Sequence, residues 1–102
     1  MAAEGKLRAK LKARVEAYGG EIRAVSWLGR RFAPDVLCLF PEGARYFTLG
    51  EKRAPNLFIE TKAPKGVVSA GQRREHAFMR SAGCGVLVID CEELLNLWLP
   101  PL

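Results

Sequence analysis

Apolar side chains recur along the first part of the chain with the period of a helix. A glycine pair at 19–20 follows them and is suited to the left-handed backbone that ends many helices. The pattern predicts an amphipathic helix over residues 3–18 whose remaining faces carry lysine and arginine. The apolar positions, spaced by four, four and three residues, are Leu7, Leu11, Val15 and Tyr18.

Four later segments have the apolar pattern of β-strands. They are residues 21–27, 35–40, 56–62 and 85–90. The second is almost continuously apolar after Asp35, which is typical of a strand buried on both faces. Between 41 and 55, glycines, prolines and charges surround a short apolar run, and this composition predicts a hairpin excursion.

Two capping boxes mark further helices. Ser69 and Gln72 begin a helix that Gly83 ends, and Asp90 with Glu93 predicts a short helix over residues 92–99. The order is helix, three or four strands, helix, strand and helix. It predicts an α/β fold with a mixed β-sheet core flanked by helices, in a single domain over residues 1–102.

Composition limits the classes of binding partner and the cellular compartments that are expected. The net charge of +5 and the pI near 9.5 favour a polyanion, above all nucleic acid. The three cysteines, Cys38, Cys84 and Cys91, lack CxxC spacing, so reduced thiols are expected rather than disulfides or structural zinc. No apolar run approaches the roughly 20 residues that cross a bilayer, and no signal peptide is evident. We therefore expect a soluble, cytoplasmic protein.

The strand over 56–62 carries two charged residues on one face. Glu60 and Lys62 are two positions apart, so their side chains point the same way, about 6–7 Å apart along the backbone. Leu57 and Ile59 point to the other face and into a core. The charged face should therefore open onto solvent, a partner or a cleft. Taken alone, the pair is equally typical of the surface of an edge strand.

A further carboxylate changes this interpretation. Asp35 begins the preceding apolar strand, and two neighbouring strands would bring it beside Glu60. Two close carboxylates repel each other unless one is protonated or a cation lies between them. Oxygen ligands of this kind suit Mg²⁺ or Mn²⁺. Lys62 would compensate part of the negative charge without a metal.

These residues carry a family resemblance. Asp35, Glu60-Thr61-Lys62 and Gln72, with a glutamate in the first helix, resemble the PD-(D/E)xK nuclease superfamily. More narrowly, residues 29–35, 58–64, 69–72 and 83–90 resemble the stand-alone VRR-NUC domains found in phages; the family usually has glycine where this chain has Phe32. The resemblance implies a restriction-endonuclease-like fold and a metal-dependent DNA endonuclease that hydrolyses phosphodiester bonds. It also implies action on branched or junction DNA, by a homodimer, in the cytoplasm of a bacterium or a phage-infected host.

The resemblance implies roles for the site residues. Asp35, Glu60, the backbone carbonyl of Thr61 and Glu4 would bind Mg²⁺ or Mn²⁺. Glu4 is chosen over Glu16 because, at ~100° per residue, it lies about 20° from Leu11, whereas Glu16 lies about 140° from it. An alternative is that Glu4 only favours the positive end of its helix.

The other two catalytic positions have roles open to argument. Lys62 would act electrostatically rather than as a general base, since nearby carboxylates favour its charged form. Gln72 would donate to water or phosphate, although it could equally cap its own helix. His76 lies one turn further along and is left out of the catalytic set, because a lone helical histidine is more often structural or exposed.

Five basic residues near the proposed site are candidates for contacts with the DNA backbone. Solvated surface charge explains them equally well. Trp27 and Phe32 could stack on bases, but large aromatics beside a strand are more often core. The basic candidates are Arg30, Arg31, Lys65, Arg73 and Arg74.

Two other functions were weighed against a nuclease. A catalytically silent DNA-binding or assembly subunit would keep the fold, yet none of the four motif positions has lost its chemistry. A doubly wound nucleotide-binding domain would need a glycine-rich loop between a strand and a helix, which is lacking. The apolar run from Leu94 to Leu99 would serve either as a core-covering helix or as a dimer contact.

Overall fold

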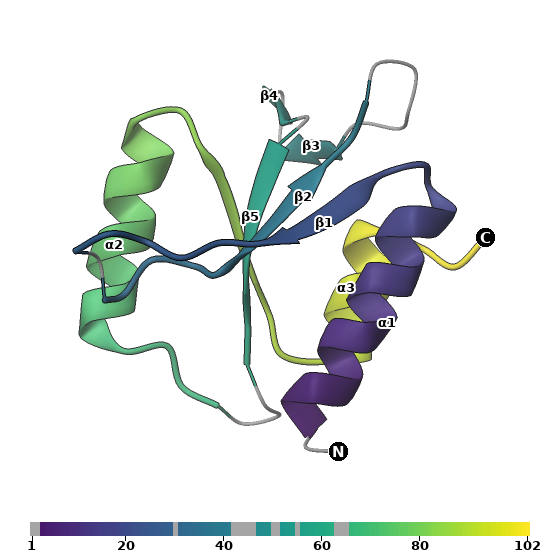
Figure 1. Ribbon diagram of the computed structural model, residues 1–102, viewed down its shortest axis with the longest axis horizontal. Helices are drawn as coiled ribbons and strands as arrows, with labels where there is room; N and C mark the ends of the chain where they lie inside the picture. Colours follow the sequence, from purple (N-terminus) through teal and green to yellow (C-terminus); the bar gives the residue numbers. More distant parts are fainter. Residues whose placement is uncertain (1–2, 30, 42–46, 50–51, 55, 63–65) are drawn as a thin grey trace.

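The computed structural model describes the chain apart from positions 1–2, 30, 42–46, 50–51, 55 and 63–65, and apart from the side chains at 3–4, 47–49, 52–54 and 56. One helix precedes a run of strands, and a helix, a further strand and a last helix follow (Figure 1). The helices are α1 (Ala3–Ala17), α2 (Ala70–Ser81) and α3 (Glu92–Trp98). The strands are β1 (Glu21–Ala24), β2 (Val36–Leu39), β3 (Phe47–Leu49), β4 (Lys52–Ala54), β5 (Asn56–Thr61) and β6 (Gly85–Ile89).

Four strands form one mixed sheet between two helical layers. Their order is β1-β2-β5-β6, antiparallel except for the parallel pair β5 and β6. Helix α2 covers one face, and α1 with α3 covers the other (Figure 1). The predicted α/β fold with helices around a mixed sheet is confirmed. The strand β5 is an inner strand, so its charged residues do not lie on a sheet edge.

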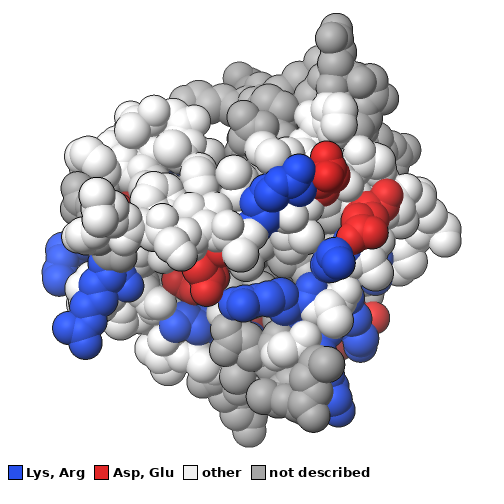
Figure 2. Space-filling model, viewed as in Figure 1, with Lys and Arg blue, Asp and Glu red and all other residues white. Residues whose placement is uncertain are grey.

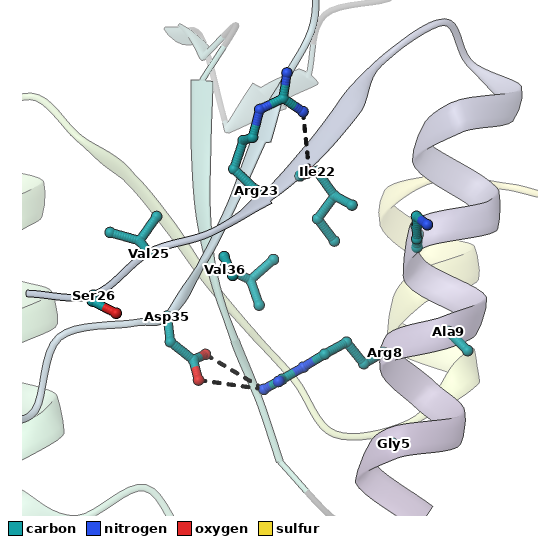
Figure 3. Close-up of a pocket in the computed structure, with 11 residues that line it drawn as sticks. Gly5, Arg8, Ala9, Ile22, Arg23, Val25, Ser26, Asp35 and Val36 are labelled. Carbon is teal, nitrogen blue, oxygen red and sulfur yellow. Dashed lines mark hydrogen bonds and ion pairs between the residues drawn. The ribbon is translucent and has the colours of Figure 1, made fainter.

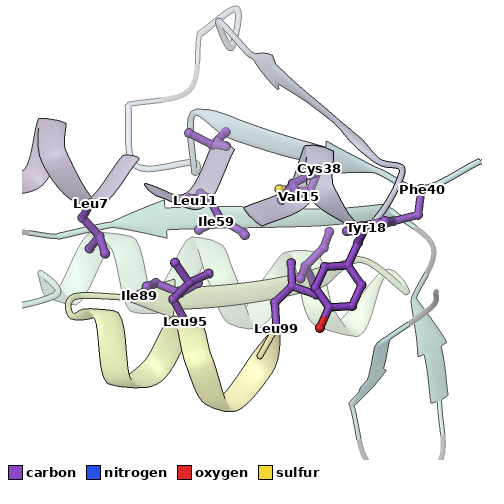
Figure 4. Packing of buried hydrophobic residues seen from close by; sticks show 12 residues of the cluster. Leu7, Leu11, Val15, Tyr18, Cys38, Phe40, Ile59, Ile89, Leu95 and Leu99 are labelled. Carbon is purple, nitrogen blue, oxygen red and sulfur yellow. The ribbon is translucent and has the colours of Figure 1, made fainter. Parts of the chain in front are cut away.

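The main core lies between the sheet and the α1–α3 layer (Figure 4). Leu11 and Val15 of α1 and Leu95 of α3 are fully buried, and they pack towards Leu57 and Ile59 of β5. The helical spacing of four and the strand spacing of two both place these apolar side chains on one surface. The apolar stripe predicted for the first helix is therefore the face that fixes α1 on the sheet.

The predicted end of α1 and the predicted N-cap of α2 are confirmed, whereas the N-cap of α3 differs from the prediction. Gly19 adopts a φ of 84° just after α1, and the Ser69–Gln72 capping box of α2 is formed in both directions. The capping box predicted for Asp90 and Glu93 is wrong. Helix α3 begins at Glu92, so its N-cap is Cys91, which makes no side-chain cap hydrogen bond. Glu93 is then one position too early in the helix to bond back to the cap.

The strands around Asp35 are shorter than predicted. Strand β1 ends at Ala24, although the Val25 amide still donates to the Asp35 carbonyl at 2.9 Å. Strand β2 begins at Val36, because Pro34 lacks an N–H and cannot extend the ladder. Trp27 lies beyond β1, where its indole N–H donates to the Pro34 carbonyl at 2.6 Å. Asp35 therefore stands just before β2.

The segment after β2 forms the predicted hairpin excursion. Strands β3 and β4 pair antiparallel as a separate two-stranded sheet, with Leu49 opposite Lys52. Residues 42–46, 50–51 and 55 of this segment lie outside the described residues.

The cysteines are free thiols, as the sequence predicted. Cys38 is buried in the core, and this burial raises the pKa of its thiol to about 12. Such a thiol is inert at neutral pH. A separate finding concerns membranes: within the described part of the chain, the helices are too short or too polar to cross one.

Candidate functional site

The register of the sheet sets Asp35 beside Glu60. Val36 lies opposite Ile59 in the antiparallel β2–β5 pair, so the next position along the ladder is Asp35 opposite Glu60. Asp35 stands just before β2, and its carboxylate contacts Arg8 of α1, whereas the Glu60 carboxylate contacts Gln72 of α2. The prediction that these strands are neighbours is confirmed, and the backbones of Asp35 and Glu60 lie at the same end of the sheet, with their side chains engaged by different helices.

Glu60 lies beneath α2 rather than facing open solvent. Only 8% of the residue is exposed, and the Gln72 amide donates to its Oε1 at 3.1 Å. The face of Glu60 was expected to open onto solvent, a partner or a cleft, and open solvent is wrong for this residue because α2 packs across that face. A buried carboxylate needs partners of this kind, since an unpaired one would be costly.

His76 forms the second contact of Glu60 with α2. Its Nε2 lies 3.7 Å from Glu60 Oε1, and among the described residues that nitrogen has no hydrogen-bond partner. Burial lowers the pKa of His76, and the charges of Arg80 and Lys62 lower it further. The imidazole is therefore neutral at pH 7. His76 is 2% exposed, so it belongs to the buried support of Glu60 and not to the surface.

Asp35 is engaged from the opposite helical layer. Arg8 of α1 extends across the end of the sheet, with its Nη2 atom 3.5 Å from each Asp35 carboxylate oxygen (Figure 3). The same Nη2 donates to Thr61 Oγ1 at 3.1 Å. Half of the Asp35 side chain is exposed. An exposed ion pair at this distance contributes little to stability and is readily exchanged for other partners.

Lys62 and Glu4 complete the predicted set in different ways. Lys62 follows β5, is partly buried, and its amide donates to the Ile89 carbonyl at 3.0 Å. This backbone bond to β6 fixes the end of β5 next to Glu60. The backbone of Glu4 lies in the first turn of α1, one turn before Arg8, but its side chain lies outside the described residues.

The chemistry of the donor set suits a hard divalent cation. Asp35 and Glu60 supply carboxylates from neighbouring strands, and the Arg8 guanidinium already provides positive charge at that end of the sheet. Across the described side chains, which do not include Glu4, no cluster of three or more His, Cys, Asp or Glu is arranged for metal binding. Two carboxylates without a third are compatible with Mg²⁺, which keeps several waters.

The predicted DNA-binding cations divide between described and undescribed positions. Arg31, Arg73 and Arg74 are exposed, whereas Arg30 and Lys65 lie outside the described residues. Figure 2 shows basic side chains over α2, over α1 and between them, with acidic groups interspersed. This surface is suited to a polyanion running across the end of the sheet.

The two aromatic candidates pack against the protein itself. Trp27 stacks at a tilt on Phe58, with ring centroids 5.4 Å apart. Phe32, which replaces a glycine of the family pattern, lies against Gly71 of α2, where an added Cβ would be 2.7 Å from its ring. The guanidinium of Arg31 stands 5.7 Å from the Phe32 centroid. The ring thus ties the loop before Asp35 to α2.

Sequence reasoning missed Arg8 of this site and left His76 out of the catalytic set. Both had a usable signal in the helical spacing of four. Arg8 follows Glu4 by one turn, and His76 follows Gln72 by one turn, so each lies on the same side of its helix as a candidate site residue. The residue type was misleading, since surface arginines and lone histidines are common without any function.

Comparison with known proteins bears on the fold and the family of the chain. A solved structure described as a VRR_NUC domain matches the chain with a TM-score of 0.78 and 30% sequence identity, over 95% of this chain and 94% of that one. No family model matches the chain, and no curated protein does.

Proposed function

The chain belongs to the VRR-NUC family, within the PD-(D/E)xK superfamily, and from that premise we propose that it is a divalent-metal-dependent DNA endonuclease. Its reaction would be hydrolysis of phosphodiester bonds. The observation that supports the proposal is that β2 and β5 are paired neighbours, with Asp35 just before β2, Glu60 in β5 and Lys62 just after β5. All three positions of the motif therefore belong to the same end of the sheet, which is where the proposed site would lie.

Asp35, Glu60, the Thr61 carbonyl and Glu4 would bind the ion, which is Mg²⁺ or Mn²⁺. When bound, such an ion lowers the pKa of a water molecule and offsets the charge of the scissile phosphate. Glu60 is prepared for this role by Gln72, whose amide orients the carboxylate from α2. A ligand fixed in this way loses less conformational entropy when it binds a cation.

Lys62 would contribute its positive charge to the phosphate as negative charge builds up on it. A positive charge held near the reacting phosphate stabilises the charge of the transition state. The Arg8 guanidinium would act similarly. Its contact with Asp35 is long and solvent-exposed, so a substrate phosphate can replace the carboxylate as its partner.

One observation favours a second candidate, the catalytically silent DNA-binding or assembly subunit. Asp35 has a cationic partner within the chain, Arg8 Nη2, as a carboxylate that only stabilises the fold would have. In such a protein, basic side chains would bind DNA while the carboxylates only stabilised the fold. Cleavage experiments distinguish the two candidates.

The test is incubation of supercoiled plasmid and four-way-junction DNA with the pure protein, in Mg²⁺, Mn²⁺ or EDTA. We expect cleavage that needs the ion and is lost in Lys62→Ala. A matched control is Lys10→Ala, which removes a lysine paired with Glu92 in α3, away from the site. Binding without cleavage in every metal would support the silent subunit instead.

A homodimer in the cytoplasm of a bacterium or phage-infected host is the setting we propose. In support, α3 turns Leu95 into the core but leaves Leu97 80% exposed. Sedimentation of the wild-type protein and of Leu97→Glu tests the dimer. A monomer in both would contradict it.

A further inference from the structure

A pocket of about 520 Å³ lies between α1 and β1, and one end of it is formed by Asp35 (Figure 3). Four residues of α1 line one wall at the spacing of a helical stripe: Gly5, Arg8, Ala9 and Lys12. This stripe is next to the buried one, so α1 uses one side for the core and another for the pocket. The volume falls within the roughly 300–1,000 Å³ typical of small-molecule sites.

The pocket combines an apolar floor with a basic rim. Ile22, Val25 and Val36 come from the strands and form its apolar side (Figure 3). The rim carries three cations: Arg8, Lys12 and Arg23. Asp35 is the acidic residue among the lining side chains, and Arg8 contacts it. A ligand that fits this pattern has a flat apolar part and a negatively charged part.

The outer two cations are available to such a ligand. Lys12 pairs with Glu16 at 3.7 Å, and its side chain is 64% exposed. Arg23 pairs with Glu21 at 3.0 Å, with half of its side chain exposed. Exposed pairs of this type contribute little stability, so a phosphate can take over their cations at small cost.

We propose that this pocket binds a single unpaired nucleotide of the DNA, next to the phosphate that is cleaved. The base would lie against Ile22 and Val36, and its phosphate would contact Lys12 and Arg23. This rests on the proposed nuclease function and narrows its substrate class to DNA with an unpaired nucleotide beside the cut. An unpaired base is favoured over a paired one, because a paired base must first leave its stack and its partner, which costs free energy.

The first test measures nucleotide binding without cleavage. ¹⁵N chemical shifts of the intact protein are followed in EDTA during titration with thymidine 5′-monophosphate, thymidine or inorganic phosphate. We expect the monophosphate to shift the amides of Ala9, Ile22 and Val25 together, more strongly than either other probe. Equal shifts with inorganic phosphate, or no shifts at these amides, would overturn the proposal.

Two variants and one control make the test specific. Ala9→Leu adds bulk to the pocket on an exposed helical position without changing charge, and Arg23→Ala removes one cation from the rim. Lys10→Ala is the control, with the same loss of charge on α1 outside the pocket. The first two should abolish the monophosphate shifts, and the control should keep them. Shifts that persist in Ala9→Leu would place the nucleotide elsewhere.

The second test compares two DNA ligands in EDTA, a blunt duplex and the same duplex with a single-stranded flap. We expect the wild type to prefer the flap roughly ten-fold and Ala9→Leu to lose that preference. Equal affinity of the wild type for both would overturn the proposal. Since neither test needs cleavage, a protein that fails them and still cuts DNA would refute the pocket and leave the nuclease intact.

Discussion

Gln72 donates a hydrogen bond to Glu60 Oε1 at 3.1 Å while its own Oε1 accepts the Ser69 amide at 3.0 Å. The two interpretations of this residue, helix cap and site residue, are therefore both present in one side chain. The amide nitrogen serves the carboxylate, and the amide oxygen serves the helix. Substitutions at two positions separate these roles.

Gln72→Ala should impair cleavage, because Glu60 loses its oriented donor. Ser69→Ala removes the cap alone and should cost about 1 kcal/mol of stability with cleavage unchanged. Urea unfolding gives the stability of each variant, and the cleavage rate is compared at a temperature where both are folded. Equal cleavage by the two variants would mean that Gln72 is only a cap.

Arg8→Met should tighten metal binding and weaken DNA binding. The Arg8 guanidinium competes with a cation for Asp35, and an exposed pair of this kind is worth up to about 1 kcal/mol, or roughly five-fold in affinity. Calorimetric titration with Mn²⁺ measures the first effect, and DNA binding in EDTA measures the second. Weaker Mn²⁺ binding by Arg8→Met would show that Arg8 supports the metal site rather than competing with the ion.

His76 should make stability depend on pH. Because burial, Arg80 and Lys62 lower its folded-state pKa, its stabilising contribution is present above the unfolded pKa of about 6.5 and is lost as the pH falls below it. Since His76 is the single histidine of the chain, His76→Gln should flatten this part of the profile. Melting temperatures in EDTA between about pH 7.5 and about pH 5.5 test it. An unchanged slope in the variant would assign the effect to carboxylates.

Gly71 and Phe32 should be energetically coupled. In an isolated helix, alanine in place of glycine gains about 1 kcal/mol, but here the new Cβ would meet the Phe32 ring at 2.7 Å. Gly71→Ala should therefore gain less than this or destabilise, whereas it should stabilise the protein in a Phe32→Ala background. A double-mutant cycle by urea unfolding measures the coupling. Additive effects would mean that the ring moves aside freely.

The sequence predicted most of the elements because the apolar periods are clear. The apolar stripe from Leu7 to Val15 and the alternation around Ile59 each bury one face. Each pattern therefore predicted both the type of element and the face that it turns to the core. The first and last residues of the elements were less predictable. Whether Asp90 or Cys91 caps α3 depends on one residue's backbone conformation, which neither side chain dictates.

The site was predictable only in part, for a related reason. Strand alternation placed Glu60 and Lys62 together, but the register that sets Asp35 opposite Glu60 depends on sheet pairing. The burial of Glu60 beneath α2 depends on how the helical layer packs on the sheet. The contact of Arg8 with Asp35 at the end of the sheet depends on the same packing. Contacts between distant segments leave little trace in a single sequence.

The most direct test of the central claim is the single-turnover rate of DNA cleavage as a function of Mg²⁺ concentration, for the wild type, Asp35→Asn and Glu60→Gln. Glu92→Gln is the matched control, since it makes the same change in a carboxylate that pairs with Lys10 outside the site. If Asp35 and Glu60 bind the ion together, the wild type and Glu92→Gln cleave with saturation in Mg²⁺, and the two site variants stay inactive although folded. Cleavage by either site variant at the wild-type rate, or none by the wild type at any Mg²⁺ concentration, would contradict the account.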